Sequence, residues 1–286
     1  MYRHVAFAAL LALAVQPAVG QPVRFGLDAE IERDDNFTRG VRDADRRSDT
    51  RVGVGGEAVK ALVLGPRTGA ILRAGARYNH QADFDDASHL ALTAGAAWRI
   101  QPKVGFSEPW IELAGDLQWL SHADSDLRDG TILSLTASVG SHVTDRVRLS
   151  AGVAADRRSG DDTGLYDLST TRIFATADWR VGLRATLYGR ISGVTGDHVF
   201  NAIDATSKGW LIPISEVIVD DPALGSGFTA YRLEATTLLY DLGFNFPLGT
   251  AHALDFSLTH FRSETDRDAR KYDGTQVRAA FLYRFQ

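Results

Sequence analysis

The sequence predicts an all-β fold, a single antiparallel β-barrel of about twelve strands that crosses a membrane. Three observations lead to this prediction. Apolar and polar residues alternate in repeated segments of about ten residues, the length that a tilted strand needs to cross a bilayer. The connections between these segments are alternately short and long. Aromatic residues gather near the ends of the segments.

Alternation is clearest in PVRFGLDAEIER, where apolar residues occupy every second position from Val23 to Ile31. The intervening positions are nearly all polar or charged, as expected of a strand with one face toward lipid and one toward a lumen. In segment 51–63 the two faces are less distinct, and in segment 229–246 the apolar phase shifts, which predicts a β-bulge. The other alternating segments are 72–79, 90–100, 111–119, 133–139, 147–155, 173–181, 183–191, 254–258 and 277–285.

The connections predict the topology. LGPRTG, QPKVGFSE, SHVTDR, RVG and FPLGT are short, whereas the connections between them are mostly longer and charged. Short periplasmic turns and long extracellular loops are typical of outer-membrane barrels, and an even strand count leaves both termini on the periplasmic side. The longest loop, at about 195–227, contains the apolar pieces 210–214 and 217–219, so we expect it to pack over the barrel mouth or inside it.

Aromatic side chains support the same topology. They fall at strand ends, as membrane-interface girdles do, whereas the core of a soluble sandwich would not gather them there. The residues predicted at the periplasmic interface are Trp98, Trp179, Phe246, Tyr283 and Phe285.

The N-terminus has the three parts of a secretory signal peptide. A short basic start precedes an apolar run from Ala6 to Val15, and small residues then lead to a predicted cleavage after Gly20. Residues 1–20 are therefore expected to be removed, and residues 21–286 to form one barrel domain. The chain has no cysteine and a net charge of −5 without a polybasic block, so we expect no disulfides and no nucleic-acid partner.

The predicted lumen face is rich in arginine. Acidic residues share this face in similar number, which favours an ion-paired interior. The alternative is an arginine-lined path for small anionic solutes. The residues assigned to that path are Arg73, Arg77, Arg99, Arg172 and Arg190.

We expect no catalytic, metal or cofactor site. Two Ser–His pairs could form a lipid-hydrolysing rim site, but neither has an evident third partner or oxyanion donor: His122 with Ser125, and His260 with Ser263. No zinc-binding spacing is present. Loop carboxylates could bind calcium or bridge to lipopolysaccharide, although such residues usually only solvate loops: Asp34, Asp35, Asp124, Asp126, Asp161 and Asp162.

The closing residues LYRF, followed by Gln286, resemble the C-terminal assembly signal of Gram-negative outer-membrane β-barrels. The resemblance implies a bacterial outer-membrane location, contact with membrane lipid and lipopolysaccharide, and recognition by the barrel-insertion machinery. EIERDDNFTRG and LTHFRSETDRDARKYDGTQVRAAFLYRF also resemble barrel domains of surface-lipoprotein and exopolysaccharide export proteins.

These patterns lead to one main functional expectation and two alternatives. We expect a passive narrow pore for small solutes, including anionic ones, or a structural membrane protein, and not an enzyme. The alternatives are an export-associated barrel and an outer-membrane lipid hydrolase.

Overall fold

A computed structural model describes residues 21–285 except 161–162, 183, 204–214, 216 and 267–269. The predicted signal peptide, Asp161, Asp162 and the apolar piece 210–214 lie outside the described residues. No helix in the described ranges is long and apolar enough to span a membrane.

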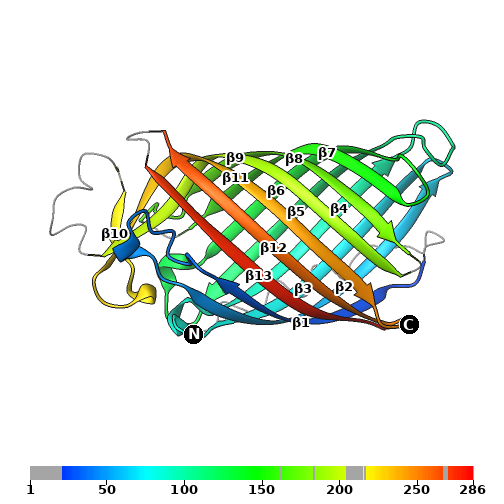
Figure 1. Ribbon diagram of the computed structural model, residues 1–286. Helices are drawn as coiled ribbons and strands as arrows, with labels where there is room; N and C mark the ends of the chain where they lie inside the picture. The colour runs from blue at the N-terminus through cyan, green and yellow to red at the C-terminus, as the bar shows by residue number, and fades with distance from the viewer. Residues whose placement is uncertain are drawn as a thin grey trace.

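Twelve antiparallel strands close into a barrel, as the sequence predicts (Figure 1). Each strand pairs with its neighbour in the chain, β9 pairs with β11, and β1 pairs with β13 to close the ring. The strands are β1 (Arg24–Asp34), β2 (Asp49–Gly65), β3 (Thr68–Gln81), β4 (His89–Ile100), β5 (Trp110–His122), β6 (Gly130–His142), β7 (Val147–Ser159), β8 (Leu168–Val181), β9 (Ala185–Ile203), β11 (Phe228–Pro247), β12 (His252–Thr265) and β13 (Lys271–Arg284).

The two ends of the barrel differ in their connections. Both termini of the barrel and the shortest connections lie at one end, here called the turn end, although the β4–β5 connection there spans residues 101–109. The two longest connections, β1–β2 and β9–β11, lie at the other end, here called the loop end. The described residues of this end include four 3-10 helices: η2 (Asp43–Asp45), η3 (Asp85–Ala87), η4 (Asp126–Arg128) and η5 (Pro222–Leu224). A short strand, β10 (Ile218–Asp220), also lies at the loop end and pairs with β11.

The outer face of the wall is apolar. Val54, Ile173 and Leu242 are 60%, 62% and 54% exposed, and many other large apolar side chains share this face. A chain in water would bury such a belt, so its exposure indicates a lipid-facing surface.

Strand β9 corrects the predicted start of the longest loop. It continues to Ile203, so residues 195–203 are strand rather than loop. The alternation fails there because Phe200 and Ala202 point inward, opposite to the lipid-facing residues nearer the turn end. Beyond Gly196, which has a φ of 132°, β9 leaves β8 and stays paired only with β11.

The bulge predicted in segment 229–246 is absent. Strand β11 keeps an unbroken register with both β9 and β12. The apolar phase shifts because Tyr231, Leu233 and Ala235 are buried on the inner face, whereas Leu238 and Tyr240 are exposed on the outer face. The inner face of β11 is therefore apolar near the loop end. This inward apolar run, and not an inserted residue, shifts the phase of the sequence pattern.

Candidate functional site

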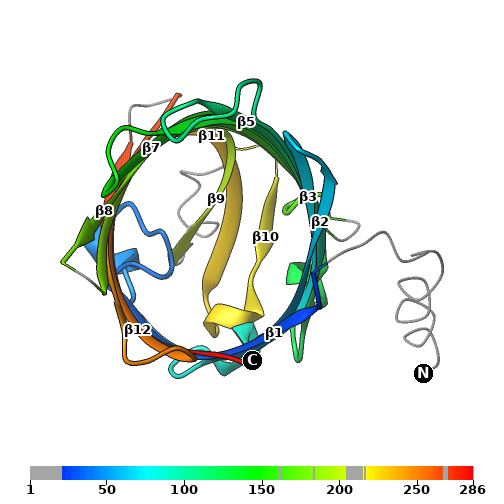
Figure 2. The ribbon, with the colours of Figure 1, turned by 90° about the vertical axis from the view of Figure 1, so that its right-hand side faces the viewer.

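An extension of the wall folds over the mouth at the loop end. Figure 2 looks along the barrel from the turn end and shows β10 with the adjoining parts of β9 and β11 crossing the ring. One face of this extension packs in a cluster that includes Phe200, Tyr231, Phe261 and Tyr272. The other face packs around Leu165, Tyr166 and Ala230. We call the extension and the loops packed on it the cap.

Aromatic contacts hold the cap together across the mouth. Phe84, from the β3–β4 loop, stacks on Phe37 of the first loop at 5.4 Å between ring centroids. Its ring also meets Phe228, at the start of β11, edge-on at 6.4 Å. Helices η3 and η5, from these same two regions, are in contact. The described part of the longest loop therefore packs over the mouth, which is one of the two placements expected from the sequence.

A buried ion pair also ties the extension to the β5–β6 loop. Arg128 in η4 binds Asp221 through a nitrogen–oxygen distance of 2.6 Å, and the Asp221 side chain is fully buried. Burial lowers the pKa of Arg128, but the facing Tyr166 and Asp221 more than offset that effect, so the pKa is raised above its ordinary value. The guanidinium therefore stays charged, and breaking the pair would strand a buried carboxylate.

Below the cap, the lumen is polar and contains two cavities of about 470 and 390 Å³. The larger is lined by residues including Arg99, Glu112, Arg148, Asp178, Arg190 and Asp241. The smaller is lined by residues including Asp28, Arg51, Glu57, Arg73, Arg77 and Gln118. Of the five arginines assigned to an anion path, four thus line a cavity; Arg172 is not among these lining residues.

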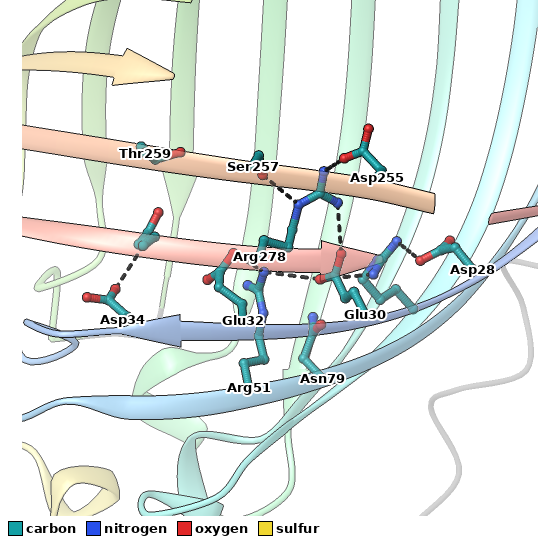
Figure 3. Close-up of polar contacts among 12 residues, drawn as sticks. Asp28, Glu30, Glu32, Asp34, Arg51, Asn79, Asp255, Ser257, Thr259 and Arg278 are labelled. Atoms are coloured by element: carbon teal, nitrogen blue, oxygen red, sulfur yellow. Dashed lines mark hydrogen bonds and ion pairs between the residues drawn. The ribbon is translucent and has the colours of Figure 1, made fainter. Parts of the chain in front are cut away.

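Strand β1 carries a row of inward carboxylates beside arginines of neighbouring strands (Figure 3). Glu30 lies at the centre of this row and accepts three ion pairs, from Arg51 and Arg77 at 3.1 Å and from Arg278 at 3.2 Å. Arg278 also binds Asp255 at 2.5 Å. Acid and base neutralise one another along this wall.

Most of the predicted path arginines have an acidic partner. Arg99 binds Glu112 at 2.6 Å. The other paired arginines are Arg77 with Asp28 and Glu30, Arg73 with Asp116, and Arg172 with Asp156. Arg190 is the exception: its guanidinium lies over the Phe174 ring, 5.5 Å from the centroid, and it makes no ion pair with any described residue.

Inward glycines keep these side chains against the wall. The Arg73 side chain crosses β4 at Gly95 to reach Asp116 on β5, and a Cβ at Gly95 would collide with this pair. Tyr188 similarly crosses β11 at Gly243, and its hydroxyl donates to Asp255 at 2.9 Å. Because the side chains lie flat across neighbouring strands, the centre of the barrel stays hollow.

Neither proposed Ser–His pair forms a catalytic arrangement. His260 is exposed on the outer face of β12, whereas Ser263 is fully buried and accepts a hydrogen bond from Thr237. Odd and even positions of a strand point to opposite faces, so these two side chains cannot meet. His122 contacts Asp129 at 3.2 Å, and the buried Ser125 hydroxyl has no hydrogen-bond partner among the described residues.

The loop carboxylates within the described ranges do not form a metal site. No group of three or more metal-ligating side chains is present in that part of the chain. Asp34 instead accepts hydrogen bonds from Arg39 and Gln276, and Asp35 accepts one from the backbone of Thr275. These carboxylates thus organise the first loop.

The five predicted interface aromatics lie at the turn end. Trp98, Trp179 and Phe246 are exposed to between 40% and 50%, near the last residues of β4, β8 and β11. Tyr283 and Phe285 contact each other edge-on at the end of β13. This placement is compatible with the predicted membrane interface.

Several uncharged residues that shape the lumen are not predicted from the sequence, because they are not part of a conspicuous charge pattern. Tyr188 and Phe174 fall at polar-phase positions, where an aromatic residue signals an inward ring. The inward glycines, such as Gly243, give a weaker signal because glycine also occurs on the lipid face.

One solved structure supports the fold, and two others are less similar. An outer-membrane channel from Pseudomonas putida F1 is similar with a TM-score of 0.57 at 13% identity, over 95% of this chain and 100% of that one. An anion-selective porin from Comamonas acidovorans gives a TM-score of 0.41 at 11% identity, over 92% and 99% of the two chains. The β domain of the Bordetella autotransporter BrkA gives 0.45 at 13% identity, over 93% and 100%. No protein-family model and no curated protein matches the sequence.

Proposed function

Because the chain is a closed twelve-stranded barrel of the outer-membrane type, we propose that it is a passive, narrow channel for small polar solutes in a bacterial outer membrane. The observation that carries this proposal is the hollow polar lumen, with cavities of about 470 and 390 Å³ inside an apolar outer wall. A structural barrel with no transport role would gain stability from a filled interior.

The proposed channel orientation follows from the ends of the barrel. The turn end faces the periplasm, and the cap faces the exterior and narrows entry. The C-terminal strand is proposed to be read by the barrel-insertion machinery, and the long loops to face lipopolysaccharide.

The charge arrangement argues against strong anion selection by the predicted arginine path. Arg73, Arg77, Arg99 and Arg172 each face a carboxylate, which cancels their field for a passing ion. We therefore propose polar solutes in general as the substrate class of the channel.

Conductance of the purified, refolded protein in planar bilayers tests this function. We expect small, long-lived conductance steps in wild type. A larger conductance is expected for the charge-neutral double variant Arg128→Gln/Asp221→Asn, because it removes a tie that holds the extension on the β5–β6 loop. The matched control is Arg99→Gln/Glu112→Gln, which removes an equal number of charges in the lumen and leaves the cap intact.

The cap also supports the alternative of a closed structural barrel, since its two apolar clusters are well packed. Folding is checked by the heat-dependent mobility of the barrel on a gel. A folded barrel that gives no conductance, in wild type and in both double variants, would reject the channel and leave the structural role as the better explanation of the cap.

A further inference from the structure

Arg190 and Asp241 are an unpaired acid–base couple in the larger lumen cavity. They are register partners on the neighbouring strands β9 and β11, and both line that cavity. Register partners on antiparallel strands have Cβ atoms about 5 Å apart, well within reach of an arginine and an aspartate. No ion pair or hydrogen bond joins the two side chains.

Two other pairs of register partners line the same cavity, and each consists of an arginine and an acid that form an ion pair. Arg99 faces Glu112 across β4 and β5, and the two form an ion pair at 2.6 Å. Arg148 faces Asp178 across β7 and β8, and they also pair at 2.6 Å. Arg190 and Asp241 have the same relative position and do not pair.

Their charged groups turn in opposite directions. The Arg190 guanidinium lies over the ring of Phe174 on β8. One carboxylate oxygen of Asp241 instead accepts a hydrogen bond from the Thr259 hydroxyl on β12, at 2.7 Å. The positive and negative groups are thus held by contacts on either side, and both residues line the same cavity.

We propose that this couple is a selectivity site for small zwitterionic solutes of the amino-acid type. The guanidinium of Arg190 receives the solute carboxylate, and the Asp241 carboxylate receives the solute ammonium group. The hydroxyls of Thr176 and Ser257 also line the cavity and offer further hydrogen bonds. This inference rests on the proposed channel function and names its substrate class.

An ordinary anion fits the site less well. A lone anion near Arg190 would also meet the uncompensated charge of Asp241 on the next strand. A zwitterion satisfies both groups at once, and a neutral solute satisfies neither charge.

Swelling of proteoliposomes tests the site with the isomers glycine, a zwitterion, and glycolamide, which is neutral. We expect glycine to enter through wild type about fivefold faster than glycolamide, a difference typical of one modest polar contact. In the double variant Arg190→Gln/Asp241→Asn the two rates should become equal. The control Arg99→Gln/Glu112→Gln removes the same charges from the same cavity and should keep the wild-type preference.

The other outcomes overturn the proposal. Equal rates in wild type, or equal loss of preference in the control, would reject the site while leaving the channel in place. Glycolate separates zwitterion from anion recognition: if Arg190→Gln slows glycolate as much as glycine, and Asp241→Asn speeds both, the site selects anions only. A folded barrel through which neither isomer passes would reject the channel, and this inference with it.

Discussion

The loop end and the turn end of the barrel use their interior in opposite ways. Near the loop end, inward positions of β9 and β11 carry Phe200, Tyr231 and Leu233, which build an apolar core in the cap. Near the turn end, inward positions of the same strands carry Arg190 and Asp241 beside a hollow lumen. The strand alternation is identical, so the type of residue on the inner face decides whether that part of the barrel is filled or open.

This comparison predicts that large apolar residues contribute most to the free energy of unfolding where they face inward at the cap. Phe200→Ala should lower the free energy of unfolding by about 3–5 kcal/mol, because it leaves a cavity in a fully buried cluster. Urea unfolding in lipid vesicles measures the change. The matched control Phe256→Ala, on the lipid face of β12, should cost less because lipid chains fill the space. Equal losses would mean that the cap core is not tightly packed.

Ion pairs should also differ in how much they contribute to stability, with the larger contribution from the buried pair in the cap. Arg128→Ala strands the buried carboxylate of Asp221 and should destabilise the barrel by about 3–5 kcal/mol. Replacing both partners, in Arg128→Met/Asp221→Leu, should restore much of that loss in the same unfolding experiment. If the double variant is as unstable as the single one, the pair does more than neutralise charge.

Replacing an inward glycine should have an intermediate effect on the free energy of unfolding. Gly243→Ala places a Cβ against Tyr188, so this ring must leave the wall, at a cost of about 1–3 kcal/mol. The displaced ring should also reduce the conductance. Gly193→Ala is the control, since a Cβ there makes only ordinary contacts with Ile173 and Leu238. An unchanged conductance in Gly243→Ala would show that Tyr188 does not limit the lumen.

The smallest effect is expected for half-exposed lumen pairs. Arg99 is 47% exposed in its ion pair with Glu112, and water screens the interaction. Arg99→Gln should therefore change the free energy of unfolding by less than about 1 kcal/mol. A loss as large as that of Arg128→Ala would mean that the lumen is much drier than its cavities indicate.

The sequence predicts the barrel well because lipid imposes a strict rule on outward positions. Residues such as Leu242 and Ile173 must be apolar at every second position, and that period is visible without a structure. The rule ends where the strands leave the lipid. The pattern therefore misplaces the start of the longest loop and suggests a bulge in β11 that does not exist.

The lumen is harder to predict because its contacts cross several strands. The inward position of Arg73 follows from alternation, but its partner Asp116 lies two strands away and is reached across Gly95. Likewise, the opposite orientations of Arg190 and Asp241 depend on contacts with the next strands. Arg190 on β9 contacts Phe174 on β8, and Asp241 on β11 contacts Thr259 on β12. Alternation assigns a side chain to a face, but it does not choose among several acids on that face.

The pairing of β1 with β13 sets the order of events in assembly. Gly26 pairs with Arg284, so the first strand of the barrel waits for nearly the whole chain before its second neighbour exists. Until then β1 has an edge of free backbone groups, which would template pairing with other chains. Such long-range closure is slow for an unaided chain. We therefore expect protection of that edge in transit, more than the stability of the finished barrel, to determine how efficiently the protein is assembled.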